Sequence, residues 1–424
     1  MMAALAPIVI AIASLALRLF NLSTPKGLVF DEVYYVDGAR DFLKFGVEVS
    51  GSKPEFIVHP PVGKWLIAGG IKLFGDNEFG WRFATALIGT LLILLFARLV
   101  HTLFYSPLIT ALGAGLMAMD GLQLVHSRTA LLDLFLTFFI LLSVYFWYRE
   151  QHWFAAIALG LALGTKWSAL YFLLLLALVS IYRVFTSYSG RAIIKPTLIK
   201  SIQYGFLPIA IYISTWTGWF LSNRGWDRKW SPSVIASWWH YHAEMLGFHT
   251  GLTQKHSYQA NPWSWMVMGR PTSFFYDSPK TCSSKNCSQE VLALGTPILW
   301  WLGTIAVAIA FGFWFQSIYK RKFNNVLNLI VLGMSAGYLP WFFFQARTVF
   351  SFYAIIFEPF MLLAIVYCIK LLLDSALDPR ISIAIVTAVV IAIFLNFIYF
   401  IPIFTGEIIN YSGWFNRMWL SSWI

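Results

Sequence analysis

Apolar runs of eighteen or more residues recur along nearly the whole chain, and they restrict its fold more than any other feature. A helix of that length spans the hydrocarbon core of a bilayer. Charged residues make up only 12% of the 424 residues, about half of the roughly 25% typical of soluble domains. We therefore predict a single all-α, polytopic membrane domain over residues 1–424.

The hydropathy pattern predicts about eleven spanning helices, with boundaries good to a few residues. They cover residues 3–20, 82–104, 107–122, 131–148, 152–165, 167–185, 201–220, 294–318, 326–344, 350–372 and 382–403. The first segment lacks the basic start and the small-residue cleavage site of a signal peptide, so we interpret it as the first span.

Lysine and arginine in the short loops set the orientation of the spans. With the N-terminus in the cytoplasm, basic loops such as 319–322 lie inside, and this bias accounts for most of the net charge of +11. The two long polar segments, 21–80 and 221–293, and the C-terminus then lie outside the cytoplasm. We expect a multi-pass protein of the plasma membrane, with no basic helix or aromatic platform that would bind nucleic acid.

The two long outer segments contain residues typical of a membrane interface. An amphipathic helix is predicted over Val62–Phe74, and its Lys64 and Lys72 can reach the lipid headgroups. In the simpler interpretation of Arg82 and Lys64, both side chains are expected to reach the headgroups and have no part in a site. The segment 221–293 is rich in tryptophan, which prefers the membrane–water boundary, so we expect it to lie against the bilayer.

Two of the three cysteines are close together in a segment predicted to lie outside the cytoplasm. Cys282 and Cys287 flank a short polar loop in the second outer segment, and outside the cytoplasm such a pair forms a small disulfide. Cys368 lies in an apolar span and is interpreted as a packing residue.

Charged residues beside the spans gather at the outer face of this topology, where charge is costly. They are Asp31, Glu32, Asp120, His126, Arg128, Asp133, Lys166, Arg347 and, two to three turns deeper, Glu358. A carboxylate at this boundary can act as a general base, and cations can neutralise a phosphate leaving group. The set suits a reaction between a lipid-linked phosphate donor and an acceptor that arrives from water.

Each of these features also has a simpler interpretation. The pair Asp31–Glu32 could be a solvated loop start, and His59 with the two prolines after it could be only a turn before the interfacial helix. Asp133 stands within an apolar run, so we expect it to pair with Arg128 or Lys166.

An ordered set of motifs resembles the protein O-mannosyltransferases, beginning with the acidic start of their first outer loop. The matching segments are Phe30-Asp31-Glu32-Val33-Tyr34-Tyr35, His59-Pro60-Pro61-Val62-Gly63-Lys64, Gly80-Trp81-Arg82-Phe83, Ser127-Arg128-Thr129-Ala130-Leu131-Leu132-Asp133, Gly164-Thr165-Lys166-Trp167-Ser168, Arg270-Pro271, Gly295-Thr296-Pro297, Phe350-Ser351-Phe352-Tyr353 and Pro359-Phe360. The resemblance covers nearly the whole chain.

The resemblance implies a GT-C type glycosyltransferase that moves mannose from a polyprenyl phosphate to Ser or Thr hydroxyls of exported proteins, with inversion. It implies that Asp31 is the base and that Glu32 supports it or orients the acceptor. The residues that we expect to bind the donor phosphate are Arg82, Arg128, Lys166 and Arg347, and those expected to support the site are His59, Asp133 and Tyr353.

The resemblance also implies partners and cofactors. The donor is a polyprenyl-phosphate mannose, the acceptor is an exported polypeptide, and membrane lipids and the export translocon are further expected partners. No metal or other cofactor is expected, because a cationic cluster makes a divalent ion redundant; an ion held by Asp31, Glu32 and Asp133 is the alternative. The segment 221–293 is too short for the MIR domain of eukaryotic members, which favours the bacterial branch.

Two other functions are compatible with the sequence. A GT-C relative could transfer a different lipid-linked sugar to a lipid or glycan acceptor, in which case a second membrane-facing cleft would replace an aqueous groove beside Asp31. A transporter is less favoured, because the sequence shows no inverted repeat and its charges gather at one face instead of at the bilayer midplane.

Overall fold

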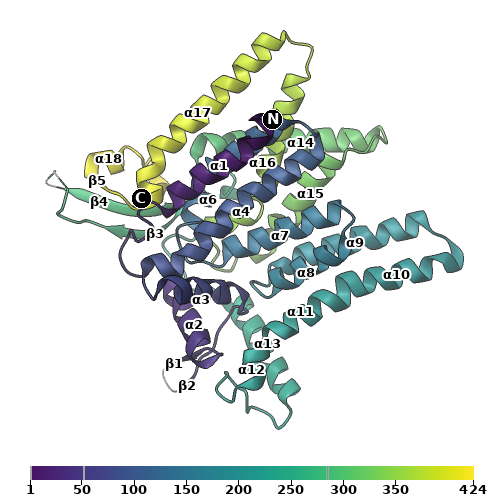
Figure 1. Ribbon diagram of the computed structural model, residues 1–424, viewed down its shortest axis with the longest axis vertical. Coiled ribbons are helices and arrows are strands. Elements are labelled where there is room, and N and C mark those ends of the chain that lie inside the picture. The colour runs from purple at the N-terminus through teal and green to yellow at the C-terminus, as the bar shows by residue number, and fades with distance from the viewer. Residues whose placement is uncertain (1, 51–52, 283, 285) are drawn as a thin grey trace. The chain divides into compact units, whose positions relative to one another are not determined.

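The computed structural model describes residues 2–50, 53–282, 284 and 286–424, and most of them are helical (Figure 1). The chain forms two compact units. The first unit consists of Met1–Phe30, Thr85–Thr129 and Gln254–Ile424, and the second consists of Asp31–Ala84 and Ala130–Thr253. The long helix α4 (Glu78–Phe104) runs from the second unit into the first.

The first unit is built around α16, whose side chains are buried over most of its length. Helices α14 and α15 pack against α16, and α1 packs against α5. The helices of this unit besides α4 are α1 (Met2–Leu19), α5 (Pro107–Ala118), α6 (Gly121–His126), α14 (Pro297–Tyr319), α15 (Asn325–Gly337), α16 (Glu358–Leu373), α17 (Pro379–Thr405) and α18 (Tyr411–Phe415).

A small antiparallel sheet in the first unit was not predicted from the sequence. Its strands are β3 (Thr272–Asp277), β4 (Cys287–Ala293) and β5 (Ile408–Asn410), paired in that order. Cys282 and Cys287 are joined in a disulfide across the β3–β4 connection, with their Cα atoms 6.0 Å apart. Ser283 and Lys285 of that connection lie outside the described residues.

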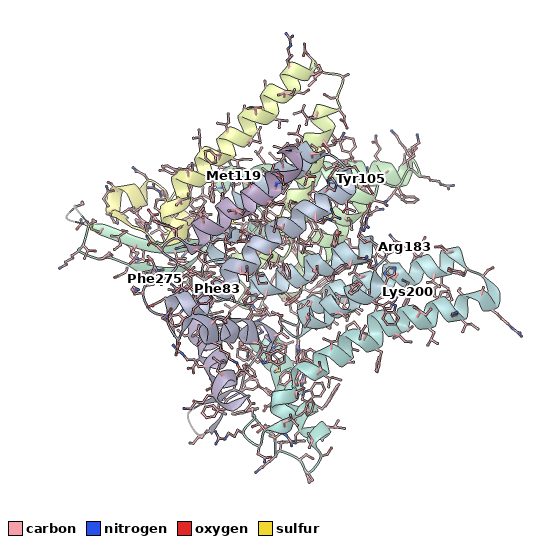
Figure 2. The ribbon with its side chains drawn as sticks, viewed as in Figure 1. Phe83, Tyr105, Met119, Arg183, Lys200 and Phe275 are labelled. Atoms are coloured by element: carbon pink, nitrogen blue, oxygen red, sulfur yellow. A yellow bond between two sulfur atoms is a disulfide. The ribbon has the colours of Figure 1, made fainter. Side chains whose placement is uncertain are left out.

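The second unit packs α2 against α3 and places α8 between α7 and α11. Its helices are α2 (Glu32–Phe45), α3 (Val62–Phe74), α7 (Asp133–Tyr148), α8 (His152–Leu163), α9 (Ala169–Ser187), α10 (Ile194–Ser201), α11 (Leu207–Thr215), α12 (Thr217–Leu221) and α13 (Val234–Gly251). A two-stranded hairpin, β1 (Val49–Ser50) and β2 (Lys53–Pro54), follows α2. Arg183 on α9 lies close to Lys200 on the adjacent α10 (Figure 2).

The predicted spans all fall on helical segments, although several are interrupted. Among the described residues, five helices are long and apolar enough to cross a membrane: α4, α9, α14, α17 and 325–344. The predicted span 107–122 is divided into α5 and α6, because Asp120 caps the second helix by accepting a hydrogen bond from the backbone N–H of Gln123. The count of eleven spans stays a prediction.

The interfacial helix has the predicted bounds, Val62–Phe74. Its exposed face carries Trp65 and Leu73, whereas Lys64 is only 1% exposed and its Nζ lies 2.5 Å from Glu48 Oε1. The expectation that Lys64 reaches lipid headgroups was therefore wrong, because its ammonium group is buried against the carboxylate of Glu48.

The tryptophans of the second outer segment fall into two groups. Trp265 is buried, and Trp226 and Trp238 are partly buried. Trp226 and Trp238 pack against the hydrophobic core of the second unit, which is formed by Val47, Val49, Trp216, Trp219, Tyr241 and Met245. Trp230, Trp239 and Trp263 are more than half exposed. Interfacial preference alone therefore did not predict the positions of the first group, because the same rings also supply core packing area.

Candidate active site

The acidic pair lies at the N-terminus of α2. Phe30, which precedes it, has the left-handed backbone angle φ 48°, a conformation that is unfavourable for a bulky residue. Asp31 occupies the N-cap position and Glu32 is the first helical residue. Unpaired backbone N–H groups give a helix N-terminus a partial positive charge, which stabilises carboxylates there.

Glu32 is completely buried and held on both of its oxygens. Arg82 Nε donates to Glu32 Oε1 at 2.8 Å and a terminal guanidinium nitrogen donates to Oε2 at 2.9 Å. The backbone N–H of Ala130 also donates to Oε1 at 2.8 Å. Because this arrangement satisfies both oxygens, Glu32 joins α2 to α4 and to the segment that precedes α7.

Asp31 is in a different environment, since its side chain is partly exposed and the hydroxyl of Tyr35 donates to its Oδ2 at a long 3.4 Å. Loss of hydration raises the pKa of Asp31 to about 6. The positive charge of Lys166 lowers this pKa and the negative charge of Asp133 raises it, both by smaller amounts. A carboxylate with a pKa near neutrality is suited to accept a proton.

Lys166 and Asp133 form a second buried ion pair in the same unit. Lys166 Nζ donates to both oxygens of Asp133, at 2.9 and 2.8 Å, and the two side chains are 9% and 2% exposed. Asp133 begins α7, whereas Lys166 lies in the turn between α8 and α9. Of the two partners expected for Asp133, Arg128 or Lys166, the structure shows Lys166.

A glycine brings this turn against the start of α3. The backbone N–H of Val62 donates to the carbonyl of Gly164 at 2.9 Å. A Cβ at Gly164 would lie 2.7 Å from a methyl group of Val62 and 2.9 Å from one of Thr215. The motifs around His59 and Lys166, which are distant in sequence, are therefore adjacent because residue 164 has no side chain.

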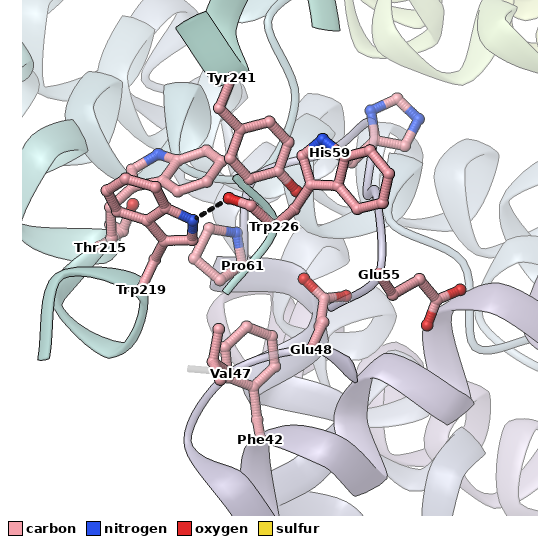
Figure 3. A pocket seen from close by; sticks show the side chains of 11 residues that line it. Phe42, Val47, Glu48, Glu55, His59, Pro61, Thr215, Trp219, Trp226 and Tyr241 are labelled. Carbon is pink, nitrogen blue, oxygen red and sulfur yellow. Dashed lines mark hydrogen bonds between the residues drawn. The ribbon is translucent and has the colours of Figure 1, made fainter. Parts of the chain in front are cut away.

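His59 lies at the edge of a pocket on the second unit (Figure 3). The space measures about 350 Å³, including its opening to solvent. The pocket is lined by Phe42, Val47, Glu48, Glu55, His59, Pro61, Thr215, Trp216, Trp219, Trp226 and Tyr241. The rings of His59 and His249 are 5.2 Å apart, and His249 Nε2 lies 2.7 Å from the carbonyl oxygen of Val58. The pocket therefore places an aromatic wall beside the carboxylates of Glu48 and Glu55.

Arg128 belongs to the first unit and is 3% exposed. Its guanidinium donates to the carbonyl oxygens at the end of α1, those of Leu17, Arg18, Phe20 and Asn21, at 2.7 to 3.2 Å. These are carbonyls that a helix C-terminus leaves without intrahelical partners. Arg128 therefore caps α1.

Arg347 and Tyr353 also belong to the first unit. Arg347 follows the 3-10 helix Leu339–Phe344 and is partly exposed. Tyr353 stacks on Trp341, with ring centroids 4.8 Å apart. In the same unit, Asp120 accepts from Trp300 Nε1 at 2.7 Å, and Glu358 is completely buried.

Arg82 does not make the headgroup contact that was expected of it. Its side chain is completely buried against Glu32, so snorkelling to headgroups was the wrong expectation. Glu48 and His249 were not among the residues predicted from the sequence. The only sequence signal for Glu48 was its position between two valines in a polar segment.

Comparisons with known proteins agree over the whole chain. Residues 8–221 match the family described as dolichyl-phosphate-mannose-protein mannosyltransferase. Residues 234–423 match the C-terminal four TMM region of protein-O-mannosyltransferase. The polyprenol-phosphate-mannose--protein mannosyltransferase of Mycobacterium tuberculosis H37Rv is 31% identical, over 96% of this chain and 88% of its own. The protein of the same name from Mycolicibacterium smegmatis is 29% identical, over 99% and 92%.

Solved structures support the same fold. The S. cerevisiae protein O-mannosyltransferase Pmt1-Pmt2 complex bound to the sugar donor matches with a TM-score of 0.84 and 16% identity, covering 100% of this chain and 93% of the matched chain. ArnT from Cupriavidus metallidurans bound to undecaprenyl phosphate matches with a TM-score of 0.56 and 15% identity, covering 94% and 71%. The fold is therefore that of the GT-C glycosyltransferases.

Replacing Arg82 with alanine is expected to destabilise the protein by about 3–5 kcal/mol, because it leaves the buried carboxylate of Glu32 without its cation. Arg40→Ala is the matched control: Arg40 pairs with Asp76 at 2.9 Å, but both side chains are at least one-third exposed, and such a pair is worth about 1 kcal/mol or less. The midpoint of thermal unfolding in detergent measures the difference. Equal decreases in the two variants would contradict the role given to the Glu32–Arg82 pair.

Proposed function

This chain belongs to the dolichyl-phosphate-mannose-protein mannosyltransferase family, and we propose that its Asp31 is the general base that activates an acceptor hydroxyl. The chain is a multi-pass membrane glycosyltransferase of the GT-C type, a mannosyltransferase. Its donor is a polyprenol-phosphate mannose and its acceptor is a protein. The relatives of M. tuberculosis and M. smegmatis carry both substrates in their names.

The different environments of Asp31 and Glu32 are the observation that supports this assignment. Both carboxylates stand at the start of α2, but Glu32 accepts three hydrogen bonds and is closed to solvent. Asp31 is partly exposed and has a pKa raised to about 6. A base needs access to substrate and a pKa near the working pH, and Asp31 meets both requirements. Glu32 is then a positioning residue that holds the start of α2.

The reaction requires one proton transfer and one displacement. The oxygen of a Ser or Thr hydroxyl attacks the anomeric carbon from the face opposite the phosphate, while the Asp31 carboxylate takes the hydroxyl proton. The bond between the anomeric carbon and the phosphate oxygen breaks, and the polyprenyl phosphate leaves with the electron pair. The configuration at the sugar carbon is inverted.

Cationic side chains stabilise the charge that collects on the departing phosphate. Lys166 is our strongest candidate for this role, because its charge already acts on the carboxylate of Asp31. For Arg128 and Arg347, which belong to the first unit, phosphate binding stays a prediction from the sequence. Arg82 acts through Glu32 and has no direct contact with the phosphate in this proposal. In this proposal the displacement needs no metal ion at the phosphate, because fixed cationic side chains supply the positive charge.

The reaction is proposed to take place at the outer leaflet of the plasma membrane. The N-terminus is then cytoplasmic, and the segments 21–80 and 221–293 and the C-terminus are outside. The lipid donor enters from the bilayer and the polypeptide from water. Because the proposed acceptor is an exported polypeptide, the export translocon is a proposed partner.

Replacing Asp31 with asparagine is expected to abolish mannose transfer while leaving the fold intact, because the amide keeps the shape of the side chain and loses the basic lone pairs. Transfer of radiolabelled mannose from a lipid donor to a Ser/Thr-rich peptide by the purified protein measures the effect. Asp37→Asn, an exposed change on the same helix, is the control and should retain activity. Wild-type rates in the Asp31 variant would remove the base assignment.

The pH dependence of kcat/KM is expected to show one ionisation near the pKa of Asp31, about 6. The base works only when unprotonated, so the rate falls as pH decreases through this value, by about tenfold per pH unit at the acid end. The rate is constant above it until other groups titrate. A profile that stays flat to about one unit below this pKa would show that a different group takes the proton.

Replacing Lys166 with alanine is expected to raise the apparent KM for the lipid donor, because the variant lacks a cation beside the departing phosphate. Lys72→Ala, on the exposed last turn of α3, controls for loss of a general positive charge. The double variant Lys166→Ala with Asp133→Asn separates lost donor binding from the effect of an uncompensated Asp133. Donor kinetics equal to wild type in both Lys166 variants would make Lys166 a purely structural residue.

A further inference from the structure

A second group of metal-ligating side chains lies in the second unit, apart from Asp31. It consists of Asp227, His240 and Glu244. His240 and Glu244 are one turn apart on α13 and therefore share a helix face. Asp227 comes from the connection between α12 and α13, where its backbone has the left-handed angle φ 47°. All three side chains are about one-third exposed.

The distances within this group are those of ion pairs, but they are longer than direct hydrogen bonds. His240 Nε2 lies 3.4 Å from Asp227 Oδ2 and 3.6 Å from Glu244 Oε1. A charge-assisted hydrogen bond is shorter, about 2.7–2.9 Å. Two ligands of a tetrahedral zinc ion, each about 2.0–2.1 Å from the metal, are about 3.3–3.4 Å apart. One ligand atom from each of the three residues lies within 4.8 Å of the other two, so one ion could contact all three side chains with small movements.

Two tryptophans orient the ligands. The ring of Trp230 stacks on His240, with centroids 4.1 Å apart and planes inclined by 9°. Trp226 Nε1 donates to Glu244 Oε2 at 2.7 Å, which leaves Oε1 as the oxygen on the side of His240. Partners that fix a ligand from behind are a regular feature of metal sites.

The nearest basic neighbour in sequence does not occupy the site. Arg228 donates through its guanidinium to the carbonyl of Phe220 at 2.9 Å. The same guanidinium lies over the ring of Trp219, 5.3 Å from its centroid. The guanidinium of Arg228 therefore interacts with two residues of α12, Phe220 and Trp219.

We propose that Asp227, His240 and Glu244 bind a divalent ion of the Zn²⁺ type through one nitrogen and two carboxylate oxygens. The exposure of the group lets the ion enter from the outer aqueous phase and leaves a coordination position for water. The ion links the 222–233 connection to α13. It thereby fixes Trp226, which lines the pocket of Figure 3. This role is structural and does not depend on the transfer reaction.

Metal titration of the purified full-length protein in detergent tests the proposal. After removal of metal with a chelator and dialysis, Zn²⁺ alone is titrated by calorimetry, and Co²⁺ alone is followed by its visible absorption. We expect one equivalent of each, the absorption of four-coordinate Co²⁺, and a higher unfolding temperature with Zn²⁺. His240→Ala and Glu244→Gln should each weaken binding by at least about tenfold.

The variants are chosen to separate loss of the site from loss of the fold. The side-chain amide of Glu244→Gln keeps an acceptor oxygen for Trp226, so this variant retains the packing and loses only the charged ligand. His256→Ala removes an exposed histidine outside the group and should bind like wild type. Binding that persists unchanged in His240→Ala and Glu244→Gln would place the ion elsewhere, and absence of binding by the wild type would also overturn the proposal.

Discussion

The buried ion pair of Glu32 and Arg82 is the interaction on which the candidate active site depends. Two charges removed from water are stable only when their geometry and additional hydrogen bonds compensate for the lost hydration. Here the guanidinium contacts both carboxylate oxygens, and the backbone of Ala130 adds a third donor. Three segments of the second unit therefore meet at one side chain, and the position of the neighbouring Asp31 follows from that junction.

The second unit contains two further buried ion pairs. Lys166 binds Asp133 and Lys64 binds Glu48, each pair formed by residues that are 16 to 33 positions apart. Asp31 accepts a long hydrogen bond from Tyr35, and its pKa is raised to about 6. The chemistry assigned to Asp31 thus follows from weaker pairing than its neighbours have. Strong pairing of Glu32, Asp133 and Glu48 makes them parts of the framework.

Much of the helical framework could be predicted from the sequence, because an apolar run can be recognised from a short stretch of residues alone. The bounds of α3 and the pairing of Asp133 with Lys166 were predicted, the latter because an acid within an apolar run requires a nearby cation. The partners of Arg82 and Lys64 were not predicted. A basic residue beside an apolar segment has the same local sequence whether its side chain reaches the headgroups or is buried against a carboxylate. The sheet strands were also missed, because β5 pairs with β4 across more than a hundred intervening residues.

Arg128 has a consequence for the order in which the protein can be completed. The carbonyls at the end of α1 receive their hydrogen bonds from a residue 107 to 111 positions later in the chain. During synthesis, the first helix is therefore completed before its terminal cap has been translated. Until Arg128 has been made, those oxygens lack the hydrogen bonds of this cap, so the end of the first helix reaches its final state only after the intervening helices have been synthesised.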